Sequence, residues 1–461
     1  MVEAKPVSTP DAVKVQGEGA RGAPSPDAAY PRPVYAWYVV GVLTVAYISS
    51  FIDRQILALL VTPIRRDLNI SDTQMSLLMG LSFALFYTFL GVPIGRLADS
   101  RSRRGIIAVG IALWSLMTAA CGVAKNYVQL LLARFGVGVG EAALSPPAYS
   151  LIADYFPRER LATALSIYSM GIYIGSGLAL LLGGAILGTV STEGMWHAPI
   201  VGDIYPWQTV FLLVGLPGLL VALLMLSVRE VPRRSRVRVQ AGGASFREVL
   251  RHMRTHWRVY TAHNLGFALW VLMGQGTAAW APTLFIRTHG WTPAETGLRY
   301  GVLVIVFGVL GIVSGGRLAD SLLRRGYTDA KIRVCLLGAL GASLFLALYP
   351  VLPSGGLAMI AFTPVMFFTA FPMGAAAAAI QEVTPGEMRA QASSIYLFVA
   401  NLIGLGLGPT AVALFTDYVF RSDDALRFSL VIVGTAAALG AAALFALCLR
   451  PYRTMVAASK H

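Results

Sequence analysis

The most constraining feature of this sequence is a long internal repeat. The run RLADSRSRRG at residues 96–105 returns as RLADSLLRRG at residues 317–326, an offset of 221 in a chain of 461 residues. The triplet Ser-Ile-Tyr at residues 166–168 returns at residues 394–396, an offset of 228. Solenoid units recur every 20 to 50 residues or so. A period of almost half the chain therefore indicates two related halves.

The composition shows that most of the chain lies in lipid. Apolar residues make up 56% and charged residues 13%, whereas soluble domains carry roughly 25% charged residues. Twelve apolar stretches reach the roughly 20 residues that cross a bilayer, and they centre near Val45, Phe83, Leu113, Val137, Tyr173, Leu216, Leu272, Ile305, Leu340, Phe367, Leu405 and Ala438. A helix satisfies its own backbone in hydrocarbon. The sequence therefore predicts an all-α integral membrane protein, with twelve transmembrane helices in two pseudo-symmetric six-helix bundles.

The distribution of basic residues predicts the orientation. With a cytoplasmic N-terminus, the inner loops hold 21 Lys and Arg and the outer loops hold seven. Cytoplasmic loops carry such an excess, so the net charge of +14 encodes topology and does not indicate nucleic-acid binding. The predicted segments are a disordered cytoplasmic tail at 1–32, an N-terminal bundle at 33–228, a basic cytoplasmic linker at 229–258, a C-terminal bundle at 259–450 and a cytoplasmic tail at 451–461.

The central linker contains a predicted amphipathic helix. Its apolar residues follow helical spacing, and they are Phe246, Val249, Leu250, Met253 and Trp257. The opposite stripe consists of Arg247, Arg251, Arg254 and Arg258. Ser245 and Glu248 have the spacing of a capping box, which opens such a helix. We expect this helix to lie on the inner membrane surface, where its arginines meet anionic membrane lipids.

A search for enzymatic motifs argues against catalysis. The sequence has no Gly-Lys dipeptide, which excludes a P-loop, and it has neither HExxH nor GxSxG. Its three cysteines stand alone in apolar spans, without the spacing of metal ligands. We therefore expect no enzymatic activity, no cofactor and no resident metal.

Four ionisable residues fall inside predicted spans, where charge is costly and typically functional. Asp53 and Arg54 lie in the first span, and Arg134 and Glu141 lie two turns apart in the fourth. At about 1.5 Å per residue, Asp53 falls between Arg134 and Glu141 in depth. One arginine between two carboxylates leaves a carboxylate to carry a proton, so these three residues are predicted to couple transport to protons. A purely structural ion pair is the alternative, and Arg54, about 100° round its helix from Asp53, is predicted to gate the outer side or to snorkel.

The repeated loop and the basic linker resemble those of the major facilitator superfamily. Gly-Arg-Leu-Ala-Asp at 95–99 and its copy at 316–320 resemble the signature between that family's second and third helices. The resemblance implies that Asp99 docks on the eleventh span and Asp320 on the fifth, which clamps the inner side in one state. The gating residues implied in this way are Asp99, Arg103 and Arg104, with Asp320 and Arg324 in the copy. The alternative is that each run only anchors the end of a helix.

The charged spans narrow the resemblance. FIDRQILAL in the first span and GVGVGEAALSPPAYSLIADYFP in the fourth are similar to Spinster-type facilitators, which are associated with sphingolipids and lysophospholipids. This resemblance implies proton-coupled transport of a lysolipid- or sphingosine-like amphiphile by alternating access. It also implies substrate contacts at Tyr168, Trp270, Gln275, Trp280 and Tyr396. Anion:cation symporters share the Asp-Arg pair of the first span, so an organic-anion or sugar-phosphate symporter is one alternative and a drug/proton antiporter is another.

The expected source and membrane location follow from the amino-acid composition and the predicted topology. Thirty-two Arg against five Lys indicate a GC-rich bacterial source, and hence a multi-pass protein of the bacterial inner membrane. The expected partners are a small amphiphilic substrate, protons and anionic lipids at the linker, with no nucleic acid, and the protein is expected to be a monomer.

Overall fold

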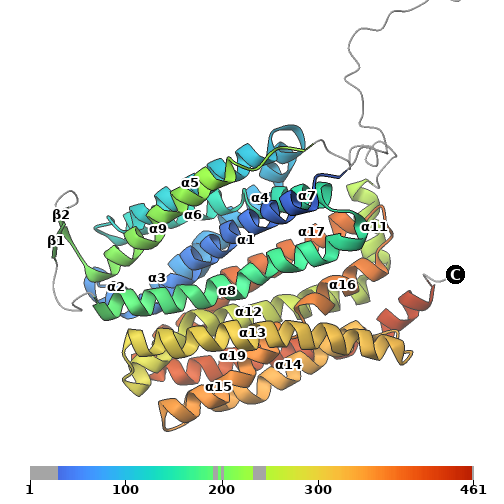
Figure 1. Ribbon diagram of the computed structural model, residues 1–461. Coiled ribbons are helices and arrows are strands. Elements are labelled where there is room, and N and C mark those ends of the chain that lie inside the picture. Colours follow the sequence, from blue (N-terminus) through green and yellow to red (C-terminus); the bar gives the residue numbers. More distant parts are fainter. Residues whose placement is uncertain (1–29, 190–195, 199–201, 232–244, 459–461) are drawn as a thin grey trace, which may run out of the picture.

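The protein is a bundle of long helices that run side by side (Figure 1). The computed structural model describes residues 30–189, 196–198, 202–231 and 245–458. The first described residues, the end of the last helix and the linker helix lie at one end of the bundle, which we call the linker end. The β-hairpin lies at the other, which we call the distal end.

The helices divide into two halves on either side of the linker. The N-terminal half contains α1 Pro33–Gln55, η1 Ile56–Leu59, α2 Val61–Leu68, α3 Asp72–Ser76, η2 Leu77–Leu81, α4 Ser82–Ser100, α5 Arg103–Cys121, α6 Tyr127–Glu141, α7 Ser145–Tyr155, α8 Arg158–Thr189, β1 Trp196–Ala198, β2 Gly202–Ile204 and α9 Pro206–Met225. The linker helix is α11 Phe246–Thr255. The C-terminal half contains α12 Trp257–His289, α13 Pro293–Arg324, α14 Ala330–Leu348, η3 Tyr349–Val351, α15 Gly355–Ala370, α16 Met373–Val383, α17 Arg389–Val399, η4 Ala400–Leu405, α18 Gly406–Leu414, η5 Phe415–Phe420, η6 Asp423–Ala425 and α19 Leu426–Ala458.

The helical segments account for the predicted spans. In the described residues, 11 are long and apolar enough to cross a membrane. The twelfth, α12, is 33 residues long, but it includes the polar residues His263, Asn264 and Gln275. Most of α12 is buried among its neighbours, so its polar groups contact protein rather than lipid. The predicted all-α membrane fold of twelve helices is confirmed.

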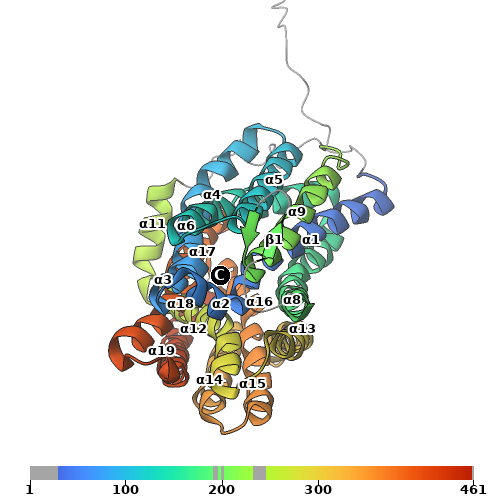
Figure 2. The same ribbon diagram turned by 90° about the vertical axis from the view of Figure 1, so that its left-hand side faces the viewer.

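The two halves pack along two long seams, and Figure 2 shows them from the distal end. At one seam α8 lies against α13, and at the other the segment formed by α3 and η2 lies against α18. The first seam depends on glycine, because a Cβ on Gly177 would stand 2.2 Å from Ile305 and a Cβ on Gly297 would stand 2.3 Å from the Leu180 carbonyl oxygen. Small residues let helices approach this closely.

The internal repeat reappears as a repeated ion pair at the linker end. Arg103, which opens α5, is buried and pairs with Asp154 near the end of α7. Lys331, in the first turn of α14, pairs with Glu382 near the end of α16 at 2.9 Å. Both pairs join residues 51 apart, and both members shift by 228 between the halves. The repeat is therefore structural as well as sequential.

The ion pair of Lys331 with Glu382 corrects the prediction that Arg324 is the counterpart of Arg103 in the second half. The shared run RLADS suggests Arg324 as its counterpart, at an offset of 221, yet Arg324 is exposed and ends α13. Between the RLADS run and the ion pair the C-terminal half has seven extra residues, because α13 continues to Arg324 and the loop after it is longer and turns at Gly326 with φ of 88°. The offset therefore rises from 221 to 228 across this region, and Lys331 takes the place of Arg103.

The predicted segments differ from the structure at their ends. The capping box of Ser245 and Glu248 is present, but α11 ends at Thr255, and Trp257 opens α12 instead. The last helix continues through Pro451 to Ala458, so most of the predicted C-terminal tail is helical. The predicted disordered tail at 1–32 lies outside the described residues up to position 29, as does 232–244 of the linker.

The Arg103–Asp154 pair predicts a stability effect. Arg103→Ala leaves a buried carboxylate without its cation, so we expect a loss of about 3–5 kcal/mol in the free energy of unfolding. Thermal unfolding of the purified protein in detergent measures this loss. Arg299→Ala is the matched control, because Arg299 pairs with Glu295 on an exposed surface, where such pairs contribute about 0.2–1 kcal/mol. Equal effects of the two substitutions would contradict the role of Arg103.

Glu230 predicts an acid-sensitive contribution at the same place. Partial burial opposes its ionisation, but the Arg104 amide and the Arg103 guanidinium donate hydrogen bonds to it, and together they hold the pKa of Glu230 below its usual range. A lowered folded-state pKa means that Glu230 stabilises the protein above its unfolded-state pKa and that this contribution disappears as the pH falls. We expect Glu230→Gln to reduce stability at neutral pH and to flatten its decline between about pH 5 and pH 3. Melting temperatures across this range provide the measurement.

Candidate substrate and proton site

The four predicted intramembrane charges meet at mid-depth between α1 and α6. Asp53 and Arg54 lie in the last turn of α1, immediately before the chain tightens into the 3-10 segment η1. Arg134 and Glu141 lie on α6, and Glu141 is its last residue. Asp53, Arg134 and Glu141 are all at most 1% exposed. The structure therefore brings the predicted residues together.

Glu141 is held by the first helix, although by a residue that the sequence did not predict. Arg54 donates a hydrogen bond from Nη2 to Oε2 of Glu141 at 2.5 Å, and Ser50 Oγ donates to the same oxygen at 2.6 Å. The prediction that Arg54 gates an outer vestibule or snorkels is therefore wrong for this state. Asp53 and Arg54 point about 100° apart, and α6 presents Glu141 to the face that carries Arg54.

Arg134 contacts backbone instead of the predicted carboxylates. Its Nη1 donates to the Asp53 carbonyl oxygen at 3.2 Å and its Nε to the Leu78 carbonyl oxygen at 3.3 Å. Leu78 belongs to η2, a π-helical segment, and such bulges disturb the regular backbone bonding of a helix. Among the described side chains, Arg134 has no ion pair. The predicted Arg134–carboxylate pair is thus replaced by a clamp of Arg134 on two backbone carbonyls.

Asp53 is a buried carboxylate without a hydrogen-bond partner. Neither of its oxygens has one in the described part of the chain, and its side chain is 0% exposed. Its polar neighbours are Trp114 and Thr118 on α5, and Arg134 is the cation nearest in effect, but none of the three forms a well-aligned hydrogen bond with either oxygen. Burial of an unpaired carboxylate in its ionised form is strongly unfavourable. The site therefore contains one carboxylate paired with arginine and one without a partner.

Arg54 also borders the space between the two halves. Its guanidinium carbon lies 4.2 Å from the ring centre of Phe83, 4.7 Å from that of Phe51 and 5.4 Å from that of Tyr87. The same residue lines a cavity of about 20 Å³ whose other walls include Gln275 and Leu405 of the C-terminal half. A volume of this size holds about one water molecule. Arg54 is therefore the charged group of this site that faces the other half.

The residues predicted to contact substrate lie in different parts of the structure. Gln275 lines the central cavity. Tyr168 is buried and stacks on Tyr47 at 4.4 Å between ring centres. Trp280 packs between α12 and α18 and donates to the Pro409 carbonyl oxygen at 2.9 Å.

The other two aromatic residues on this side belong to one cluster. Trp270 stacks on Phe267 at 5.0 Å, and Tyr396 lies 4.7 Å from the same ring. Tyr396 and Trp270 are 3% and 5% exposed. In this structure they pack the C-terminal half, in the same way as Trp280, and do not line the central cavity.

An ion-pair network that sequence reasoning missed joins the halves at the distal end. Asp72 opens α3 and receives both ends of the Arg287 guanidinium from α12, at 2.7 and 2.8 Å. Arg65 bridges Asp72, at 3.1 Å, and Asp423 of the C-terminal half, at 2.8 Å. Asp417, in the first turn of η5, accepts bonds from the Thr73 amide and hydroxyl at 2.7 and 2.6 Å. We call these residues the distal network.

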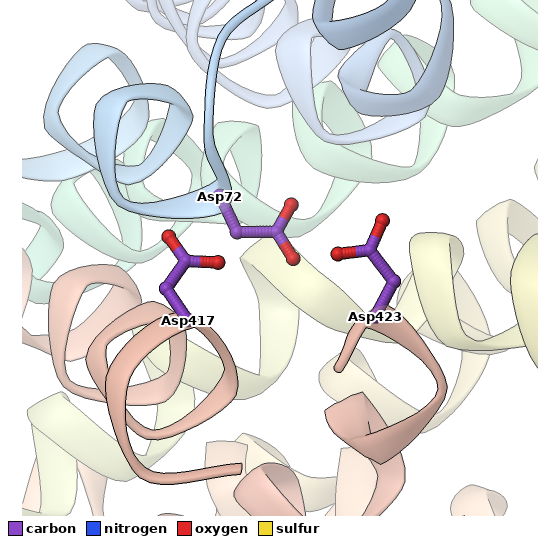
Figure 3. Close-up of side chains that lie close together, drawn as sticks. All are labelled: Asp72, Asp417 and Asp423. Carbon is purple, nitrogen blue, oxygen red and sulfur yellow. The ribbon is translucent and has the colours of Figure 1, made fainter. Parts of the chain in front are cut away.

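The acidic residues of this network converge, as Figure 3 shows. One oxygen each of Asp72, Asp417 and Asp423 lie within 4.8 Å of one another, close enough to surround a cation. Arg65 and Arg287 already supply the positive charge there. The arrangement is therefore an interdomain salt-bridge network, in which arginine binds Asp72 and Asp423 and Thr73 binds Asp417.

The predicted clamp at the linker end is not seen among the described side chains. Asp320 is exposed and has no ion pair among them, and the side chains at 158 and 159, which open α8, lie outside the described set. The side chain of Asp99 lies outside the described set. Arg103 and Arg104 instead bind the segment after α9, through Glu230 and the carbonyl oxygens of Val228 and Val231.

Comparison with known proteins agrees with this architecture. The profile of the Major Facilitator Superfamily matches residues 43–409. The chain therefore belongs to the major facilitator superfamily and is a multi-pass membrane transporter of that class. It is 29% identical over 437 residues to an MFS-type efflux pump of Mycolicibacterium smegmatis, covering 91% of this chain and 94% of the relative. It is also 24% identical over 425 residues to a probable L-galactonate transporter of Escherichia coli, with 88% of each chain covered.

The resemblance to Spinster-type transporters is confirmed. The chain is 29% identical over 441 residues to protein spinster homolog 1 of Rattus norvegicus, covering 88% of this chain and 79% of the relative. A solved bacterial homolog of the human lysosomal transporter Spinster, in an inward-facing and unoccupied conformation, superposes with a TM-score of 0.75 at 26% identity. That comparison covers 93% of this chain and 98% of the other.

The distal network predicts a shift in conformation. Asp72→Asn removes the charge that two arginines share, so we expect the closed distal end to lose on the order of 3 kcal/mol. Spin labels at Asn69→Cys and Ser422→Cys, on opposite halves, should then show a second, longer distance. Arg66→Gln is the control, because Arg66 pairs with Asp67 within the same half. An unchanged distance distribution for Asp72→Asn would show that the network does not hold this end closed.

Proposed function

We propose that the protein is a proton-coupled secondary active transporter of a lysolipid- or sphingosine-like amphiphile. The observation that carries the coupling is the asymmetry of its two buried carboxylates, because Glu141 has a guanidinium partner and Asp53 has none. A carboxylate without a partner in a low-dielectric site favours its protonated form. A carboxylate paired with arginine favours its ionised form, so the two residues suit different steps of a proton cycle.

The proposed cycle uses Arg54 as the exchangeable partner. Protonation of Glu141 removes the charge that holds Arg54, and the guanidinium is then free to bind the phosphate of a lysolipid, or the hydroxyl groups of a sphingosine-like substrate, in the space between the halves. Asp53 takes or releases its proton when α1 moves relative to α5 and α6. Arg134, bound to the Asp53 carbonyl oxygen, keeps this turn of α1 at a fixed depth while the exchange takes place.

We further propose that the linker end is cytoplasmic and that this conformation is inward-facing. The distal network joins the halves at the opposite end, and the similar bacterial structure is described as inward-facing. The clamp of Asp99 and Asp320 then belongs to the outward-facing state, in which the linker end closes. The excess of basic residues in the loops of the linker end supports the same orientation, in the inner membrane of a bacterium.

The substrate class is supported by the surroundings of Arg54. A single guanidinium framed by Phe51, Phe83 and Tyr87 suits one polar head group next to an apolar body. The name of the relatives at 29% identity, spinster homolog 1, points in the same direction. The similarity to a probable L-galactonate transporter keeps an organic-anion symporter as the second candidate. The similarity to an efflux pump keeps a drug/proton antiporter as the third.

A flux experiment tests the proposal. Purified protein in liposomes should take up labelled lysophosphatidylcholine or sphingosine when a pH gradient is imposed. We expect Glu141→Gln and Asp53→Asn to abolish gradient-driven uptake, while at least one of them still exchanges substrate across the membrane without a gradient. Glu295→Gln, which changes an exposed carboxylate, is the control and should transport normally.

The outcomes separate the candidates. Uptake of a sugar acid without uptake of either lipid would favour the organic-anion symporter. Lipid flux that ignores the gradient in all variants would assign the four charged residues a structural role and overturn the proton cycle. The partners proposed here are therefore the amphiphile and protons, for a protein that works as a monomer.

A further inference from the structure

A basic groove at the linker end has no place in the transport cycle. It is formed by the first turn of α12 and the last turns of α19, and it encloses about 620 Å³. Arg258 comes from one wall and Arg450 from the other, and His256, Trp257, Thr454 and Met455 complete the part that concerns us. The groove belongs to the C-terminal half alone, far from the central charges. Arg258 belongs to the predicted arginine stripe of the linker helix, but it lies on α12, whereas Arg247, Arg251 and Arg254 lie on α11.

The two arginines of the groove differ from the other cations near them. Arg333 and Arg453 both bind Asp329, and Lys331 binds Glu382. Arg258 and Arg450 are exposed, and they have no carboxylate partner in the described part of the chain. Two guanidinium groups without carboxylate partners, one on each wall, attract an anion that both can bind at once. Phosphate suits this role, because its oxygen atoms match the hydrogen-bonding geometry of guanidinium.

The surface next to the groove is apolar and faces away from the protein. On α19, Leu439 and Leu447 are 49% and 69% exposed, and Arg450 continues their stripe one turn later. On α12, Leu265 is 38% exposed and lies two turns from Trp257, which is 58% exposed. α12 and α19 are in close contact along their length. In a membrane protein, an exposed apolar stripe of this kind contacts acyl chains.

We propose that this groove binds the phosphate of an anionic membrane phospholipid, with its acyl chains along the apolar stripe of α12 and α19. Charge complementarity selects the head group, because Arg258 and Arg450 both present unpaired positive charge. Trp257 lies at the level where indole rings favour the interface between head groups and acyl chains. Basic pockets between transmembrane helices on the cytoplasmic side are known to suit such lipids. The lipid is a bound component of the C-terminal half and is not the transported substrate.

Titration with phosphatidylglycerol tests the site. The full-length protein in detergent is mixed with phosphatidylglycerol or phosphatidylcholine, and bound lipid is counted by native mass spectrometry. We expect one phosphatidylglycerol to be retained, and we expect Arg258→Gln/Arg450→Gln to weaken its binding about tenfold or more. Both arginines are exposed, so the variant should fold. Its unchanged melting temperature verifies that.

The control variant is Arg317→Gln/Arg325→Gln, which removes two exposed arginines of the C-terminal half outside the groove and outside the linker helix. It should change the binding less than about threefold. Equal losses of phosphatidylglycerol binding in the two variants would show only a general attraction between charges and would contradict a specific site in the groove. Displacement of the lipid by millimolar glycerol phosphate would show that a free phosphate compound is the ligand, which also contradicts the proposal.

The position of the lipid is tested separately. Phosphatidylglycerol with brominated acyl chains should quench the fluorescence of Trp257, so the quenching should be smaller in Trp257→Phe than in the wild type. Phosphatidylcholine with the same bromination should show a smaller difference. Identical quenching in wild type and Trp257→Phe would place the lipid elsewhere. None of these measurements depends on transport, so a failed lipid site and a failed proton cycle are distinguishable.

Discussion

The cost of burying charge in an apolar environment governs the arrangement of this protein. Buried charges are tolerated where a partner or a set of hydrogen bonds replaces water. Arg103 has Asp154, Glu141 has Arg54, and Asp72 has two arginines. Asp53 lacks such a partner among the described residues, and this exception is the observation on which the proposed proton cycle rests.

Much of the fold follows from the sequence because its controlling patterns are local. The length of apolar stretches, the spacing of the repeat and the Ser245–Glu248 capping box each depend on residues close together in the chain. The depth of Asp53 relative to Arg134 also follows from the rise per residue, and the bond from Arg134 to the Asp53 carbonyl oxygen agrees with it.

The relations that the sequence did not reveal depend on how helices turn and slide against one another. Helical geometry predicts that Asp53 and Arg54 point to different sides, but it does not say which side α6 covers. Predicting the pair of Arg54 with Glu141 requires knowledge of how both helices are rotated about their axes. The partner of Asp72 lies 215 residues away, and the counterpart of Arg103 is displaced by extra residues at the end of α13 and in the loop after it. These relations depend on tertiary packing, which no local sequence pattern encodes.

The distal network and the central site share one short segment of chain. Asp72, which binds Arg287, is six residues before Leu78, whose carbonyl oxygen binds Arg134. The π-helical segment η2 lies between α3 and α4, and the π-helical segment η4 approaches it from the other half, where Leu405 O is 2.9 Å from the position of a Cβ on Gly80. A regular helix would transmit rotation rigidly, whereas a π-helical segment can return to α-helical geometry by moving one residue in register. Opening of the distal end must therefore move the backbone that holds Arg134, and through it the turn of α1 that carries Asp53 and Arg54.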